Sequence, residues 1–352
     1  MTGERTMSQS NLPGGKGEQI LEQNNYYGMN YRDTKDLCLD LIQCELKSYK
    51  QEAALEAKKR NDELLNRLFE KIQKEKMDDV TVGEEFKNPD MQYTYVDAQK
   101  AYIRSGTKEL EEVLTDLLVR RIKERERSLL QIAFREAITI VPMLIPKQLD
   151  ALALCFLVRY TKTTSVNNIE SLIQYLNNEI LPFADFLDEA KKESFFTHLS
   201  YTKAGNVEVT SISMEKCLSN TYAGLFCSGY ERKQIENYKS QYPKLFLPCL
   251  HDSTKWQINA VDEEVLKSQF KIYPHMTEQE KEKIIQLFTN NIMPEDKVKD
   301  VLCKMNPNYV HLFELWNDTP LKKLSLTTVG IVLASMRIKM IVDDDINMSI
   351  WI

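Results

Sequence analysis

The sequence has 352 residues, and its composition is that of a folded protein, with 43% hydrophobic and 28% charged residues. Glycine and proline number only 11 each, which excludes collagen-like and Pro/Gly-rich disordered chains and argues against a β fold with many turns. The formal net charge is −6, which argues against nucleic acid as the main partner.

The cysteine and hydropathy patterns together indicate a cytoplasmic protein without a membrane span. The seven cysteines are an odd number without C-x-x-C spacing, which is typical of reduced thiols rather than of a disulfide framework. Residues 1–17 lack the apolar core of a signal peptide. No stretch approaches the roughly 20 apolar residues of a spanning helix, so we expect no stable membrane insertion.

Residues 1–29 form a head that is rich in Gly, Gln and Asn and poor in aliphatic residues. Such a segment buries too little apolar surface to offset its ordering entropy, so we predict that it is flexible unless a partner orders it. Tracts of Gln and Asn can also stack as ladders between chains. The head residues that we predict to make such contacts are Gln19, Ile20, Gln23, Asn24, Asn25 and Tyr26.

Residues 30–141 have the apolar spacing of long amphipathic helices. Apolar residues recur every three or four positions through residues 37–72, and no Gly or Pro occurs between Leu37 and Gly83, which predicts one long helix. After a loop and a short helix over residues 90–103, Thr107 begins a second long helix that continues to Ile140. We predict that the two long helices pack as an antiparallel, coiled-coil-like hairpin, because a single one would leave its apolar stripe exposed. We also predict that the protein self-associates through this hairpin. The stripe residues to which we assign these contacts are Leu37, Leu41, Leu46, Tyr49, Leu64, Leu68, Ile72, Leu110, Leu114, Leu117 and Leu118.

Residues 142–352 predict an all-helical globular domain of shorter helices. The segment 148–160 is apolar nearly all round and is therefore expected to be the central core helix. The residue types of 206–213 alternate between two faces, as in a short strand, but no partner strand is recognisable elsewhere in the sequence. The closing Trp351-Ile352 is expected to pack against the protein. The fold class is thus all-α, a long antiparallel helical hairpin followed by a multi-helix bundle.

Motifs for catalysis, cofactors or metals are missing from the sequence. Neither G-x-x-x-x-G-K-[ST] nor G-x-G-x-x-G occurs, and Cys249 with His251 is not a catalytic dyad without tertiary geometry. The basic residues of 120–127 alternate with Glu124 and Glu126, which indicates a salt-bridged helix face rather than a nucleic-acid-binding stripe. We therefore assign no catalytic, cofactor-binding or metal-binding residue and expect no cofactor.

Several segments together resemble a bacterial family of about this length that is known by locus names and has no assigned activity. They are Gly14–Asn25 running into Tyr31–Leu41, then Leu149–Thr161, Tyr222–Phe226 and Ser349–Ile352. The resemblance implies a bacterial, cytoplasmic protein and transfers no catalytic residue. The head also weakly resembles the short Gly/Asn/Gln motifs through which some bacterial immune receptors and effectors template one another into amyloid-like stacks.

These observations favour a non-enzymatic interaction protein, namely a sensor, adaptor or self-assembling scaffold. Its partner would be another protein or a further copy of itself in a homo-oligomer, and the analogy with the head motifs suggests antiviral defence. The alternative is a nuclease or hydrolase effector with a site assembled from separated carboxylates, whose sign would be acids of perturbed pKa in a cavity. A further alternative is a membrane-disrupting effector that uses Leu149–Tyr160 after refolding.

Overall fold

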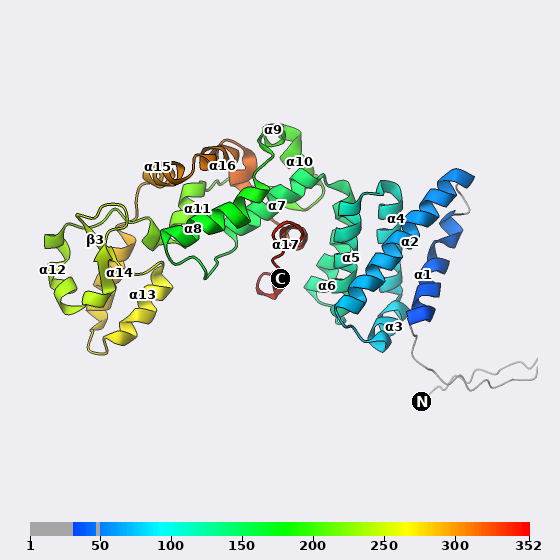
Figure 1. The fold of residues 1–352 in the computed structure, drawn as a ribbon, viewed down its shortest axis with the longest axis horizontal. Helices are drawn as coiled ribbons and strands as arrows, with labels where there is room; N and C mark the ends of the chain where they lie inside the picture. Colours follow the sequence, from blue (N-terminus) through cyan, green and yellow to red (C-terminus); the bar gives the residue numbers. More distant parts are fainter. Residues whose placement is uncertain (1–30, 47–49) are drawn as a thin grey trace, which may run out of the picture.

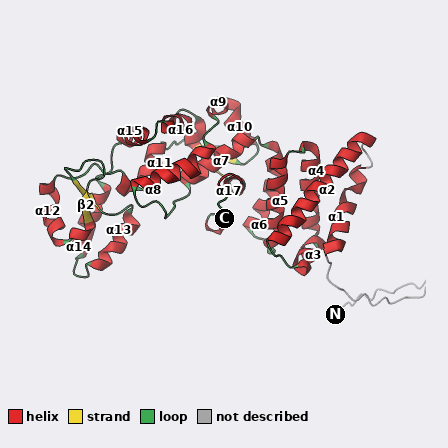
Figure 2. Cartoon of the chain, viewed as in Figure 1, coloured by secondary structure: helices red, strands yellow, loops and turns green. Residues whose placement is uncertain are grey.

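The computed structural model describes residues 31–46 and 50–352. Helices make up most of this part of the chain and the strands are short (Figure 2), which confirms the all-α prediction. The elements form an elongated molecule of three parts (Figure 1). An N-terminal bundle lies at one end, a group around α7 (Pro146–Arg159) and α17 (Thr328–Val342) lies in the middle, and a small lobe lies at the other end.

Local sequence signals set the ends of the helices in the N-terminal bundle. The Asp78 side chain accepts a hydrogen bond from the Thr81 amide (3.0 Å), and Ser128 accepts one from the Gln131 amide (3.0 Å), so both act as N-caps. Gly106 ends another helix in the left-handed conformation, with φ of 67°. The described part of the bundle consists of α1 (Tyr31–Leu46), α2 (Gln51–Lys74), α3 (Asp79–Lys87), α4 (Pro89–Ser105), α5 (Lys108–Lys123) and α6 (Leu129–Ile140).

The structure corrects the predicted hairpin in both the length and the direction of its helices. The second long helix is divided into α5 and α6 by residues 124–128, and the first into α1 and α2. Because α4 packs on both α2 and α5 and returns the chain between them, α2 and α5 run parallel. Ion pairs between these two helices accordingly join residues 45 positions apart, as Arg67 to Glu112 and Lys71 to Asp116. Apolar periodicity identifies the buried face of a helix but not the neighbour that covers it.

The central group is built on α7, which is buried along most of its length, as its sequence predicts. The last long helix of the chain, α17, packs on α7, α6 and α5 and so joins the bundle to the rest of the molecule. The C-terminal end folds back as expected. The Trp351 indole donates a hydrogen bond to the Tyr160 carbonyl (3.0 Å), and its ring meets Phe156 edge to face at 5.0 Å.

Short elements complete the middle of the molecule. The strand predicted over residues 206–213 is confirmed only at residues 206 and 207, which belong to the three-residue β1, and residues 208–213 are not in a strand. Contrary to the prediction, β1 has an antiparallel partner, β4, which lies far along the chain, with Gly205 opposite Leu326. The remaining elements of this part are η1 (Val141–Met143), α8 (Ile169–Tyr175), η2 (Leu176–Ile180), η3 (Leu181–Phe183), α9 (Leu187–Ala190), α10 (Glu193–Tyr201), β1 (Gly205–Val207), α11 (Met214–Thr221), η4 (Ala223–Leu225), α15 (Glu295–Met305), α16 (Asn308–Asn317), η7 (Pro320–Lys323), β4 (Leu324–Leu326) and η8 (Met348–Ile350).

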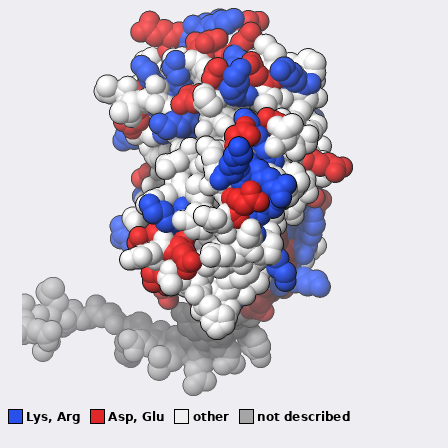
Figure 3. Space-filling view, turned by 90° about the vertical axis from the view of Figure 1, so that its left-hand side faces the viewer, with Lys and Arg blue, Asp and Glu red and all other residues white. Residues whose placement is uncertain are grey.

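The lobe at the far end has a hydrophobic core of its own, which includes Leu245, Leu266 and Ile284. In sequence it lies between α11 and α15, which pack on each other, so it is an insertion between two neighbouring helices. Its outer face carries basic and acidic side chains side by side (Figure 3). The elements of the lobe are α12 (Arg232–Gln241), η5 (Pro243–Leu245), β2 (Phe246–Pro248), β3 (Trp256–Ile258), α13 (Glu263–Gln269), η6 (Phe270–Ile272) and α14 (Glu278–Thr289).

Candidate functional site

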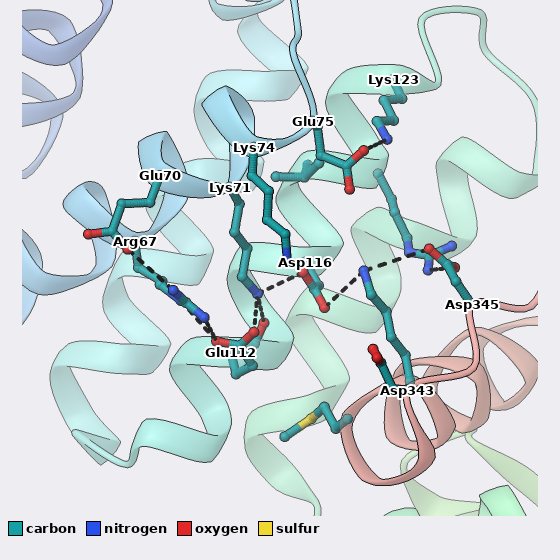
Figure 4. Close-up of a pocket in the computed structure, with 14 residues that line it drawn as sticks. Arg67, Glu70, Lys71, Lys74, Glu75, Glu112, Asp116, Lys123, Asp343 and Asp345 are labelled. Atoms are coloured by element: carbon teal, nitrogen blue, oxygen red, sulfur yellow. Dashed lines mark hydrogen bonds and ion pairs between the residues drawn. The ribbon is translucent and has the colours of Figure 1, made fainter.

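A cavity lined mostly by charged residues lies where α2 and α5 meet the C-terminal end of α17 (Figure 4). The cavity has a volume of ≈ 560 Å³, and we call it the charged groove. Six basic and six acidic residues line it, so the lining carries no net formal charge. These residues are Arg67, Lys71, Lys74, Arg120, Lys123, Lys339, Glu70, Glu75, Glu112, Asp116, Asp343 and Asp345.

The parallel packing of α2 and α5 aligns the charges on one wall of the groove. Positions four residues apart lie on the same face of a helix, so the same pairing repeats from one turn to the next. Lys71 donates hydrogen bonds to Asp116 (2.7 Å) and to the Glu112 carbonyl (2.9 Å), and one turn earlier Arg67 binds the Glu112 carboxylate (2.8 Å). Lys71 and Asp116 are both buried, which shields their ion pair from solvent.

The other wall is formed by the end of α17 and the acidic residues after it. Asp343 adopts a left-handed conformation with φ of 57° and ends the helix, and the chain then turns so that Asp345 binds Arg120 of α5. Lys339 lies 3.6 Å from Asp116 and 3.8 Å from Asp345. The carboxylate of Asp345 lies at this helix C-terminus, where the helix dipole disfavours it, and it is compensated by Arg120 of α5 and Lys339 of α17.

Ion pairing lowers the pKa of three carboxylic acids in the groove, those of Glu75, Glu112 and Asp345. Burial alone would raise the pKa of Glu112, but hydrogen bonds from Lys71 and Arg67 outweigh it and hold the pKa below its usual value. The hydrogen bond from Lys123 lowers the pKa of Glu75. For Asp345, burial acts upward and the charge and hydrogen bond of Arg120 bring the pKa below its ordinary value. These acids are therefore ionised at neutral pH and are not poised to donate a proton.

We expect acid to weaken the contact between α2, α5 and the C-terminal segment. A carboxylic acid whose pKa is lowered by folding adds stability above its unfolded value, which is 4.5 for Glu112, and this stability is lost as the pH falls through the lowered folded value. The free energy of unfolding, measured by denaturant titration from pH 7 to pH 3, should therefore decrease below about pH 4.5.

Replacing Lys71 by methionine should reduce that pH dependence, because Glu112 then loses one of the cations that lower its pKa. The matched control is Lys297→Met on α15. Lys297 is exposed, and its Nζ makes a long, solvent-exposed ion pair with Asp300 (4.0 Å), so this variant should keep the wild-type pH dependence. A pH profile of Lys71→Met that coincides with that of the wild type would contradict the assignment.

The structure places the predicted stripe residues within the protein's own core. Because their side chains are covered by other parts of the same chain, they are not available to a partner, which corrects the interaction role assigned to them. The buried ones are Leu64, Leu68, Ile72, Leu114, Leu117 and Leu118, and the partly buried ones are Leu37, Leu41 and Leu110. The side chains of Leu46 and Tyr49 and the six predicted contact residues of the head lie outside the described residues.

Cys249 and His251, which were considered from the sequence as a catalytic dyad, each hydrogen-bond to a backbone carbonyl instead of to each other. The Cys249 thiol is buried and lies 3.5 Å from the Cys227 carbonyl, and a ring nitrogen of His251 lies 2.7 Å from the Leu225 carbonyl.

Among the described residues, no group of three or more His, Cys, Asp or Glu is arranged to hold a metal ion. Within the same part of the chain, no helix combines the length and apolar character needed to cross a bilayer.

A second surface of interest lies at the junction of α6 and α7. Residues 142–146, which we call the apolar connector, have the sequence Pro-Met-Leu-Ile-Pro, and the side chains of Met143 and Ile145 are 45% and 48% exposed. The connector borders a cavity of ≈ 220 Å³ that Leu110 and Leu149 help to line. Sequence reasoning did not identify this surface, although its unbroken apolar run was the available signal.

A comparison with protein-family models matches residues 28–352, which include both the charged groove and the apolar connector. No protein of curated function and no solved structure matches the chain. Since the family match spans nearly the whole sequence, the protein belongs to this family, an uncharacterised one that is designated by a locus name.

Proposed function

We propose that the protein is a non-enzymatic interaction protein that self-associates through the apolar connector. The observation that supports this most directly is the exposure of consecutive apolar residues beside an apolar cavity. Covering contiguous apolar surface removes it from water, which is favourable, and such patches on folded proteins commonly mark binding surfaces.

The partner that we propose for the connector is the same segment of a second copy. A two-fold contact brings one patch against its own equivalent, so apolar residues face apolar residues without any further requirement. Polar side chains lie next to the connector, including Asp97 and Arg104 in the adjoining cavity. An apolar centre with a polar rim is the usual arrangement of a protein interface.

The charged groove supports this proposal over a hydrolase or nuclease. Three of its carboxylates, those of Glu75, Glu112 and Asp345, have cationic partners and lowered pKa values, whereas a general acid at neutral pH needs a raised pKa. A bacterial, cytoplasmic protein of antiviral defence is the biological setting that we propose for the interaction, by analogy with the sequence motifs of the head.

The test is the solution mass of the full chain as a function of concentration, measured by light scattering. We expect a concentration-dependent increase above the monomer mass in the wild type. In Ile145→Asp a charge would have to be buried at the contact, so this variant should remain monomeric at the same concentrations.

Val209→Asp is the matched control, because Val209 is 95% exposed and lies outside the helices; it should associate as the wild type does. A wild-type chain that is monomeric at all concentrations would refute self-association through the connector. If the wild type and Ile145→Asp associated equally, the contact would have to lie on another surface, which would also contradict the proposal.

A further inference from the structure

A second polar cavity lies at the lower end of the bundle, between the start of α4 and the connection from α5 to α6. Its volume is ≈ 260 Å³. Arg125 and Arg127 reach it from the connection and Arg135 reaches it from α6. The full lining is Asn88, Asp90, Arg125, Arg127, Gln131, Ile132 and Arg135.

The arginines around this cavity outnumber the acids that neutralise them. Asp90 is bound by Arg135 (3.1 Å) and by the buried Arg121 (3.0 Å). Glu85 is likewise shared by Arg121 (3.3 Å) and Arg125 (3.4 Å). Three arginines therefore share two carboxylates, and the fourth arginine, Arg127, forms no ion pair with any residue that the structure describes.

The acidic residues next to these arginines in the sequence do not line the cavity. The Glu124 carboxylate accepts a hydrogen bond from the Ser128 hydroxyl (2.7 Å), and Glu126 is exposed. The cavity thus has an excess of two positive charges, in a protein whose formal net charge is −6. A local excess of this kind attracts anions in spite of the overall charge.

The connection that carries Arg125 and Arg127 is held in place by the helix that follows it. The buried Gln131 side chain donates hydrogen bonds to the carbonyls of Glu124 (2.9 Å) and Arg125 (3.3 Å). Gln131 and Ile132 place the first turns of the twelve-residue α6 at the cavity, so the positive end of the helix dipole adds to the arginine charges. Arg121 pairs with Asp90 of the cavity lining, and its Nε is buried without a hydrogen-bond partner among the described residues.

We propose that this cavity binds the terminal phosphate of a small phosphorylated ligand. Arginine presents its N–H groups in a planar fork that matches phosphate oxygens, and several arginines converging on one cavity can neutralise a dianion. The volume lies below the range of about 300–1,000 Å³ that is usual for drug-sized ligands. The cavity therefore suits a phosphate group alone, which can be free inorganic phosphate or the phosphate of a mononucleotide whose sugar and base lie outside the cavity.

Isothermal titration calorimetry of the full chain with inorganic phosphate, adenosine 5′-monophosphate and adenosine tests this assignment. We expect both phosphate compounds to bind and to compete with each other, and adenosine not to bind. Binding of the monophosphate in preference to inorganic phosphate would identify the organic group as part of the ligand, and equal affinities would identify free phosphate as sufficient.

Arg127→Gln should weaken phosphate binding about tenfold or more, since it removes charge-assisted hydrogen bonds. Its fold should be retained, because Arg127 is exposed and no carboxylate depends on it. The matched control is Arg232→Gln on α12, in the lobe at the far end of the molecule. It makes the same charge change on an exposed arginine and should leave the affinity unchanged.

Three outcomes would overturn the proposal. The first is that neither inorganic phosphate nor the monophosphate binds at millimolar concentration. The second is that Arg127→Gln and Arg232→Gln weaken binding equally, which would reveal a non-specific charge effect. The third is that only a single-stranded oligonucleotide binds, with a steep salt dependence, which would make the arginines part of a nucleic-acid surface.

Discussion

Replacing Arg337 with methionine is expected to lower the free energy of unfolding by about 3–5 kcal/mol at pH 7, the usual effect of breaking a buried ion pair. Arg337 lies on α17, and its side chain is buried between α7 and α5. It donates a hydrogen bond to Asp150 (2.7 Å) and another to Glu109. Asp150 is itself buried, so the substitution leaves a carboxylate without its cation in a place that water does not reach.

The effect should depend on pH with a defined sign. Burial raises the pKa of Asp150 even though Arg337 acts to lower it, and removing Arg337 must raise this pKa further. A folded state with a raised carboxyl pKa is stabilised relative to the unfolded state as the pH falls. The difference in stability between the wild type and Arg337→Met, measured by denaturant titration, should therefore be smaller at pH 4.5 than at pH 7.

Removing the isolated charge provides the control for this prediction. Asp150→Asn in combination with Arg337→Met keeps the side-chain volume and eliminates the unpaired carboxylate, so the double variant should be more stable than Arg337→Met alone. If Arg337→Met cost less than about 1 kcal/mol, or if its cost were the same at both pH values, the ion pair would not hold α17 to the bundle.

Replacing Gly330 with alanine is expected to destabilise the protein by about 3 kcal/mol, which is the upper part of the range for overpacked sites. Gly330 lies in the first turn of α17, where the Cβ of an alanine would be 1.9 Å from the carbonyl oxygen of Ala204. This oxygen belongs to the backbone and also accepts a hydrogen bond from the Thr327 hydroxyl (3.2 Å), so it cannot move away freely. Thermal or denaturant unfolding measures the loss.

Helix propensity predicts the opposite sign at this position, which makes the result decisive. Alanine in place of glycine within a helix is favourable by about 1 kcal/mol when nothing obstructs the side chain. Ile341→Ala on the same helix is the control, because Ile341 is exposed and its loss should change stability by less than about 0.5 kcal/mol. A Gly330→Ala variant as stable as the wild type would show that α17 and Ala204 can separate.

The helices and their ends were largely predictable because their signals act over a few residues. Thr107 was predicted to begin a helix, and it is the N-cap residue of α5. The cap at Ser128, which begins α6, was missed, because the apolar spacing continues across the break. The apolar segment around Leu152 and Phe156 was expected to be the central core helix, and it forms the buried α7. The tail ending in Trp351 was expected to pack against the protein, and its indole does so on α7.

The charged groove was not predictable, because its residues come from stretches of the chain more than 200 positions apart. Arg120 and Arg121 looked like parts of a helix face that pairs with the neighbouring glutamates. In the structure Arg120 binds Asp345, and Arg121 binds Glu85 and Asp90. A charged side chain on a helix surface has the same local pattern whether its partner is one turn away or on another element.

Helix content, helix caps and the buried face of each helix follow from interactions among residues within about four positions of one another, and these were accessible without coordinates. The neighbours and directions of the helices depended on the complete fold. The parallel pairing of α2 and α5, the separate core of the inserted lobe and the exposure of Met143 and Ile145 all arise at that level. Apolar surfaces throughout the chain compete for the same partners, and burial favours the arrangement with the lowest total free energy rather than the best local match.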